Sequence, residues 1–141
     1  MRRRLAQLLL LLPLLAIGMG ARGAEPMYLP PPIDLPDGAE PKAVSAAIRS
    51  ALIGRGWSVD RETIPEGDGP REIVATLRVR VHTATIRLEF DAERIRIHYV
   101  SSDNLGFKEK KGRDPLIHPK YGVWIRNLEN DVKAKLAMLA G

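Results

Sequence analysis

The chain has 141 residues, of which 28% are charged and 45% hydrophobic, and its formal net charge is +5. This length suits one domain, and the mixed composition excludes wholesale disorder and collagen-like repeats. The sequence contains no cysteine, which excludes a disulfide framework, a thiolate nucleophile, a thiolate metal site and a lipid-anchor acceptor.

The first 24 residues have the pattern of a secretory signal peptide. Three arginines at positions 2–4 precede an apolar run over residues 5–17, and small residues follow it. A basic start, an apolar stretch and a small-residue exit are typical of such signals. The run is shorter than the roughly 20 apolar residues that a membrane span needs, and Pro13 interrupts it. We expect cleavage between residues 21 and 25 and, without an acceptor cysteine, a periplasmic protein that has no covalent tether.

Most of the excess positive charge lies in this predicted signal. Removing residues 1–24 takes away four of the 22 basic residues and none of the 17 acidic residues, which leaves 18 basic residues and a net charge of +1. Binding to nucleic acid, which the charge of the whole chain suggests, therefore loses its main support.

Residues 25–40 contain five prolines and two aspartates. Such a segment lacks backbone donors and buries little apolar area. We therefore expect an extended spacer that leads into a single domain over residues 41–141. The alternative is a polyproline ligand for a groove on a partner.

An amphipathic helix is predicted to begin at Pro41, a residue that suits the first helical position. Gly54 or Gly56 is expected to end it. The alternation that begins at Trp57 predicts a short strand, and the glycines and prolines of residues 61–71 predict a loop. The apolar stripe of the helix consists of Val44, Ala47, Ile48, Ala51 and Leu52.

Three runs of alternating apolar and polar residues follow, over residues 73–82, 84–90 and 94–99. They predict an antiparallel meander with one apolar face.

The register of this meander follows from the rule that each face stays on one side of the sheet. We expect a two-residue turn at positions 82–83, which pairs Val81 with Ala84. A four-residue connection then pairs Phe90 with Ile95.

A long amphipathic helix is predicted after a polar, lysine-rich stretch over residues 101–116. Pro119 suits its first position, with His118 as an imperfect cap. The predicted fold is therefore α+β in the order α-β-β-β-β-α, with a four-stranded antiparallel sheet and both helices packed on one face. The apolar stripe of this last helix consists of Tyr121, Trp124, Ile125, Leu128, Val132, Leu136 and Leu139.

The predicted register places a row of basic side chains on the polar face of the sheet. Arg78 is expected opposite Arg87, and Arg87 opposite His98. Like charges directly across strands are destabilising. The row therefore predicts one of two arrangements. Either guanidinium forks hold an anionic ligand, or the arginines extend into water and cover apolar surface with their stems. The candidate anion-binding residues are Arg78, Arg80, Arg87, Arg96 and His98.

Residues 107–113 form a second basic cluster with one aromatic residue. A flexible cationic loop of this kind could touch anionic lipid headgroups or lipopolysaccharide, although surface attraction is only about 1 kcal/mol per basic residue. The alternative is a solvated loop. The residues concerned are Phe107, Lys108, Lys110, Lys111 and Arg113.

The sequence offers little for catalysis or metal binding. His82, His98 and His118 have no acid and nucleophile in a triad pattern, and no spacing supplies the three or four ligands of a zinc site. No glycine-rich phosphate loop follows a strand. We therefore expect no enzyme activity, no metal and no cofactor. A small hydrolase would need a cleft that brings His98 or His118 to a carboxylate.

A group of polar and aromatic residues surrounds the last helix. Tyr121 and Trp124 lie on its apolar stripe, where core packing is expected, and Asn127 adjoins the stripe. We expect Asn127 to bond the backbone of the preceding loop. The group, with Ser101 and Asn104, would then hold this loop to the helix.

Several of these residues resemble the motifs of a family of small exported proteins and lipoproteins from proteobacteria. The likeness covers roughly residues 41–135, in the segments Gly56-Trp57, Val81-His82, Ser102-x-Asn104-Leu105 and Ile117-His118-x-x-Tyr121-x-x-Trp124-Ile125-x-Asn127-Leu128-x-x-Asp131. No activity is assigned to members of this family, so the resemblance implies an envelope location and no particular reaction. The chain departs from the family in lacking the lipid-acceptor cysteine and in having Gly122 where asparagine is usual.

We expect a monomeric, single-domain periplasmic protein with a non-enzymatic role in binding or in supporting the cell envelope. Its expected partner is an unidentified envelope component or protein. The alternative is a module that binds phosphorylated glycans or lipid headgroups through Arg78, Arg87 and His98. Helices packed on that face would exclude the anion site, because unpaired buried arginines are costly.

Overall fold

The computed structural model describes residues 23–140. All but the last two residues of the predicted signal peptide therefore lie outside the described part. The elements are β1 (Glu25–Pro26), β2 (Ile33–Asp34), α1 (Pro41–Gly54), β3 (Ser58–Thr63), β4 (Arg71–Val79), β5 (His82–Phe90), β6 (Arg94–Asp103), β7 (Lys108–Lys110), β8 (Arg113–Ile117) and α2 (Pro119–Ala137).

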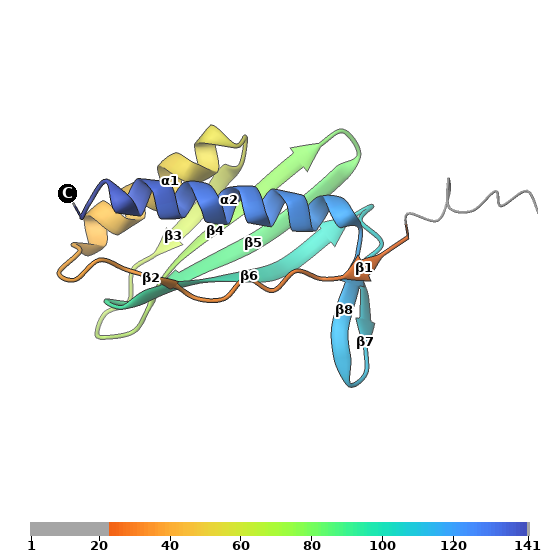
Figure 1. Ribbon diagram of the computed structural model, residues 1–141, viewed down its shortest axis with the longest axis horizontal. Coiled ribbons are helices and arrows are strands. Elements are labelled where there is room, and N and C mark those ends of the chain that lie inside the picture. The colour runs from red at the N-terminus through yellow and green to blue at the C-terminus, as the bar shows by residue number, and fades with distance from the viewer. Residues whose placement is uncertain (1–22, 141) are drawn as a thin grey trace, which may run out of the picture.

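The fold is α+β, as predicted, and both helices lie on one face of an antiparallel sheet (Figure 1). The expected four strands form this sheet, but β2 adds a fifth, and the order is β2-β6-β5-β4-β3. A second sheet, with the order β1-β8-β7, replaces the loop that was expected after the meander. Strands β1 and β2 pair with segments far away in the chain, which alternation within one strand cannot reveal.

Helix α1 forms as predicted. Pro41 is at the start, and the five stripe residues are buried against the sheet and α2. The chain leaves the helix through Gly56, whose φ of +85° favours glycine. Trp57 is then buried at 3% exposure, and its amide donates to the carbonyl of Leu52. The following strand β3 extends to Thr63, further than the sequence predicts.

The β4–β5 hairpin turns two residues earlier than expected. Arg80 and Val81 form the turn, and Leu77 pairs with Ala84, so the predicted pairing of Val81 with Ala84 is wrong. Alternation defines the register only in steps of two residues, because a shift of two returns every side chain to its own face. The turn decides between these registers. Arg80 takes a left-handed φ of 56°, and Val81 is 67% exposed at the tip.

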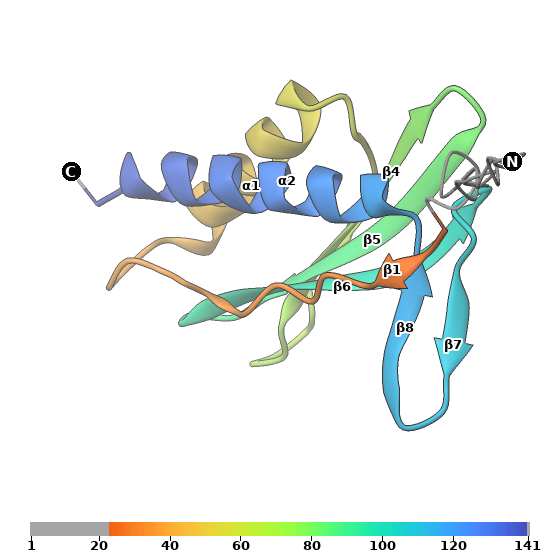
Figure 2. The same cartoon turned by 45° about the vertical axis from the view of Figure 1, so that its right-hand side comes forward.

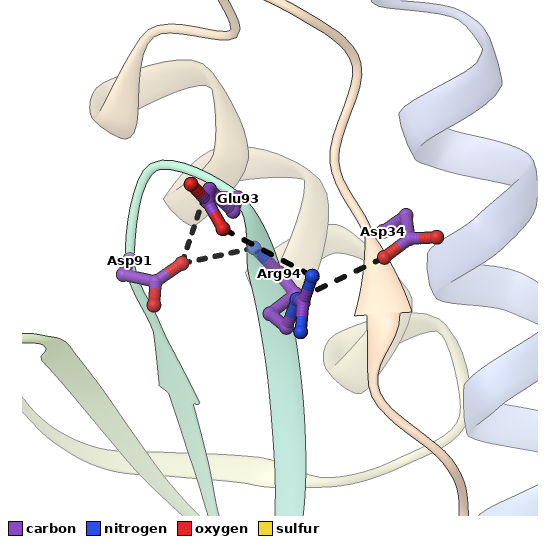
Figure 3. A network of polar contacts seen from close by, with 4 residues as sticks. All are labelled: Asp34, Asp91, Glu93 and Arg94. Carbon is purple, nitrogen blue, oxygen red and sulfur yellow. Dashed lines mark hydrogen bonds and ion pairs between the residues drawn. The ribbon is translucent and has the colours of Figure 1, made fainter.

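The β5–β6 connection has the predicted register, with Phe90 paired to Ile95. Asp91 shapes this turn, because its carboxylate accepts the backbone N–H groups of Glu93 at 2.7 Å and of Arg94 at 2.9 Å (Figure 3). These two hydrogen bonds lower the pKa of Asp91. The Arg94 guanidinium lies 3.9 Å from a carboxylate oxygen of Glu93 and 3.9 Å from one of Asp34.

Residues 25–35 run alongside β6 and form part of the fold, where an extended spacer was expected (Figures 1 and 2). We call this segment the strap. It pairs with β8 through β1 and with β6 through β2. Met27 and Ile33 are each 4% exposed and belong to the core. Prolines are compatible with this position because an edge segment needs few backbone donors. The burial supports a structural role for the strap over a polyproline ligand.

Strands β7 and β8 form a hairpin that projects from the end of the molecule nearest β1 (Figure 2). The cationic residues lie on this hairpin, where a flexible loop was expected. Gly112 provides its turn with a φ of +74°. The backbone N–H of His118 donates to the carbonyl of Leu105 at 2.8 Å and so closes the base of the hairpin.

Helix α2 begins at Pro119, and His118 caps it as predicted, with its ring nitrogen accepting the N–H of Lys120 at 3.0 Å. The stripe is buried from Tyr121 to Leu136 except for half-buried Trp124. Leu139 is 40% exposed beyond the helix end, so its predicted place on the stripe is wrong.

Candidate functional site

The sheet face opposite the helices, which we call the open sheet face, carries four of the five predicted anion-binding residues, all but Arg80. Its side chains are exposed or half-buried, except for Val74, which is buried beneath its neighbours. The pairing register places on it Asp60, Arg61, Glu72, Val74, Thr76, Arg78, Thr83, Thr85, Arg87, Glu89, Arg96, His98, Ser101 and Asp103.

Arg87 and His98 are directly opposite each other on β5 and β6, as predicted. Arg87 Nε lies 3.7 Å from a carboxylate oxygen of Glu72. Neither Arg87 Nε nor His98 Nε2 has a hydrogen-bond partner within residues 23–140, although both atoms are buried. Buried polar atoms in proteins normally have partners, so this pair needs an explanation.

The rest of the predicted basic row does not form. Arg78 faces Thr83, and beyond it Asp103, instead of Arg87, because the hairpin turns earlier than expected. Arg80 lies in that turn. Arg96 pairs with Glu89 across the strands.

Hydroxyl groups and acids occupy the middle of this face. Thr76 donates to a carboxylate oxygen of Asp60 at 2.6 Å, and its hydroxyl lies 3.0 Å from that of Thr85. The open sheet face is therefore of mixed charge, with one adjacent pair of basic side chains.

The cationic hairpin differs from the loop that was expected. Phe107 is half-buried and stacks on Tyr99 with ring centroids 4.4 Å apart, so part of its ring is already covered by the domain. Lys108, Lys111 and Arg113 are exposed on the hairpin. Two acids, Glu109 and Asp114, lie among the four cations and reduce their net charge.

The group that was expected to hold the loop to the last helix is arranged differently. Asn104, at a left-handed φ of 58°, donates from its side chain to the carbonyl of Val81 at 2.7 Å. It therefore binds the β4–β5 turn and not α2. Within the described residues Asn127 has no side-chain hydrogen bond, so the bond expected from it to the loop backbone is not present.

The aromatic members of that group pack in or against the core. Trp57 and Tyr121 are buried, at 3% and 2% exposure, and the half-buried Trp124 packs against the core. The rings of Tyr121 and Tyr99 pack edge to face, with their centroids 5.7 Å apart. Burial, with a smaller contribution from Tyr99, raises the pKa of Tyr121, so its hydroxyl stays protonated.

One polar cluster was not foreseen from the sequence. Tyr28 of the strap donates its hydroxyl to Glu129 of α2 at 2.8 Å, and the guanidinium of Arg126 lies 4.2 Å from the centre of the Tyr28 ring. Glu129 is 6% exposed, and its second oxygen has no hydrogen-bond partner in the described chain. Burial, followed by the bond to Glu129, raises the pKa of Tyr28. Only the position of Glu129 on the otherwise apolar buried face of the helix could have indicated this contact.

His82 and His118 are neighbours, although 36 positions separate them in the sequence. Their ring centroids are 5.7 Å apart. Burial lowers the pKa of His118, and the nearby charges of His82 and Lys120 lower it further, while Glu25 opposes them. Among residues 23–140 no histidine forms an ion pair with a carboxylate. The same residues contain no group of three or more histidine, aspartate or glutamate side chains that could hold a metal ion.

An open cleft of about 660 Å³ lies at the other end of the sheet, between the β3–β4 loop and the β5–β6 turn. Arg71 and the acids Asp68, Asp91 and Glu93 line it together with exposed Ile64. None of the residues predicted to bind a ligand contributes to this cleft.

Comparisons with known proteins returned no match, whether to a family model, to a curated protein or to a solved structure. Neither helix in the described part of the chain is long and apolar enough to span a lipid bilayer.

Proposed function

We propose that the chain is exported, loses its signal peptide between residues 21 and 25, and acts in the periplasm as a non-enzymatic binding module. The charged start and apolar run of residues 1–24 support export. The first strand begins at Glu25 and pairs there with Ile117. Cleavage in the expected range would therefore leave the strap and its contacts intact.

The open sheet face is the surface that we propose for binding. Both helices pack on the opposite face (Figure 1). Apart from the buried Val74, the side chains of this face are exposed or half-buried. The observation that carries the proposal is the pair formed by Arg87 and His98 across neighbouring strands. Each has a side-chain nitrogen without a hydrogen-bond partner among residues 23–140.

An anion that bears phosphate or carboxylate oxygens suits this pair. The Arg87 side chain is 38% exposed, so the outer nitrogens of its guanidinium can reach a ligand. A planar guanidinium forms paired hydrogen bonds with such oxygens. The ligand class that we propose is a phosphorylated glycan or lipid headgroup of the cell envelope. An approaching anion would compete with Glu72 for Arg87.

The alternative surface is the β7–β8 hairpin, which projects from the body of the protein (Figure 2). Its Lys108, Lys110, Lys111 and Arg113 would bind anionic lipid weakly, at about 1 kcal/mol per basic residue. With the ring of Phe107 partly covered by Tyr99, this contact would depend mainly on charge.

The test is binding of the processed protein to lipopolysaccharide, cardiolipin vesicles and peptidoglycan across a salt series. Arg87→Gln removes the central guanidinium, and Arg78→Gln is the matched control because it makes the same change elsewhere on the same face. Loss of one charge-assisted contact is expected to weaken binding about tenfold or more. Arg78→Gln should change it far less.

Equal losses in the two variants would refute a site at Arg87, since they would indicate general charge attraction. Loss only in Lys108→Gln/Lys111→Gln would move the contact to the hairpin. If none of the three materials bound, the anion proposal would be wrong. Export is tested separately, by cell fractionation and by the mass of the processed chain, and a chain that retains residues 1–20 would contradict it.

A further inference from the structure

We infer that His82 and His118 form an acid-sensitive latch that holds the base of the β7–β8 hairpin and the start of α2 together. The latch opens when His118 is protonated. The inference is independent of the ligand proposed above, because it concerns the opposite end of β5 and the first turn of α2. Three segments meet at this latch, namely the β4–β5 turn, the link between β6 and β7, and the junction of β8 with α2.

The first half of the latch joins the β4–β5 turn to the link after β6. His82 Nδ1 lies 2.7 Å from the backbone oxygen of Asn104. A carbonyl oxygen only accepts, so Nδ1 of His82 carries the hydrogen. The side chain of Asn104 returns a hydrogen bond to the carbonyl of Val81 at 2.7 Å. These two bonds fix Asn104 in its left-handed conformation beside the turn.

The second half joins the hairpin base to α2. The backbone N–H of His118 donates to Leu105, and the Nδ1 of its ring accepts the backbone N–H of Lys120 at 3.0 Å. Nδ1 of His118 must therefore be free of hydrogen, which a neutral imidazole allows and an imidazolium does not. Protonation of His118 thus removes the cap of α2 directly.

The charges that face His118 also oppose its protonation. The two histidine rings are 5.7 Å apart, and Lys120 follows on the same helix, so a proton on His118 adds a cation beside other basic groups. It also adds a cation to the N-terminal end of a helix, where the helix dipole disfavours positive charge. Burial is the largest cause of the lowered pKa of His118, the two basic neighbours add to it, and Glu25 of β1 offsets part of the lowering.

The direction of the pH effect follows from this lowering. The unfolded or locally opened chain binds a proton at the ordinary histidine pKa of about 6.5, whereas the closed latch binds it only at lower pH. Acid therefore favours the open form, and the stability of the closed latch falls as the pH drops below the ordinary histidine pKa of about 6.5. The Leu105–His118 bond closes the hairpin base, so opening would free the hairpin together with the first turn of α2.

The experiment is amide hydrogen exchange on protein expressed from the full sequence and purified as the cell processes it. Protection is compared at pH 7.5 and pH 5.0 after correction for intrinsic exchange rates. Losing a helix cap corresponds to about a fivefold increase in local opening. We expect this loss of protection at the amides of His118, Lys120, Tyr121 and Gly122 and not in the central strands.

Two variants separate the latch from general acid unfolding. His118→Asn retains a good cap that does not titrate, so the local pH effect should disappear. His98→Gln removes the third histidine, which lies on the open sheet face, and should retain the effect. The inference is wrong if His118→Asn keeps the wild-type pH effect, if His98→Gln abolishes it, or if protection falls equally throughout the fold.

Discussion

Replacing Tyr28 by phenylalanine tests how the strap is held to the domain. The change removes only the hydroxyl that donates to Glu129 at 2.8 Å and leaves the ring beneath Arg126. Glu129 is 6% exposed, its other oxygen has no hydrogen-bond partner in the described chain, and the nearest ammonium group, that of Lys133, is 4.0 Å away. A hydrogen bond to a charged group contributes about 1.5–3 kcal/mol. We therefore expect the free energy of unfolding to fall by about 2 kcal/mol.

Urea unfolding measures this loss. With a denaturant slope of about 2 kcal/mol/M, typical of a chain of this size, the midpoint should fall by about 1 M. Tyr99→Phe is the matched control, because it deletes a hydroxyl that lies 2.7 Å from Ser102, a neutral partner. Its expected cost is about 1 kcal/mol or less. The reasoning would be refuted if Tyr28→Phe cost no more than Tyr99→Phe.

Three further predictions concern the strap, the hairpin turn and the contact between the helices. Ile33→Ala should destabilise the protein by about 2–4 kcal/mol in urea unfolding, because Ile33 is 4% exposed, whereas Leu29→Ala, at 56% exposure on the same strap, should change little. Arg80→Gly should be neutral or raise the melting temperature, because the φ of 56° strains a side chain, and Arg80→Val should lower it; a stable Val variant would contradict this account of the turn. Arg55 donates two hydrogen bonds to Asp131, at 2.6 and 3.2 Å, and this hydrogen bonding lowers the pKa of Asp131. The stabilisation from the pair is therefore present above the ordinary aspartate pKa of about 4 and is lost as the pH falls below it. Arg55→Gln should therefore flatten the pH dependence of stability below pH 4, and an unchanged acid profile would refute the assignment.

The central strands and both helices could be predicted because their signals are local. The stripe from Val44 to Leu52 and the stripe that begins at Tyr121 repeat at the helical period, and each proline marks the helix start. Alternation likewise identified which side chains of β4, β5 and β6 face the helices. It could not locate the turn at Arg80, because a shift of two residues preserves every face.

The candidate site shows the same division. Arg87 and His98 were correctly placed opposite each other, because the short β5–β6 connection fixes that register and Asp91 stabilises it. Arg78 was placed wrongly, because its position depends on the other turn. An error of two residues at one turn moves a side chain by four positions along its partner strand, and that is enough to separate Arg78 from Arg87.

The sequence by itself determined the period of both helices and of the central strands, and the face that most of their side chains take. It also supports the prediction of an export signal. Tertiary structure alone decided where the strap lies, how Tyr28 meets Glu129 and how His82 meets His118. These contacts join residues 101 and 36 positions apart. Local propensity extends over a few residues, whereas such contacts depend on the simultaneous packing of several elements, and no single segment of the sequence specifies that packing.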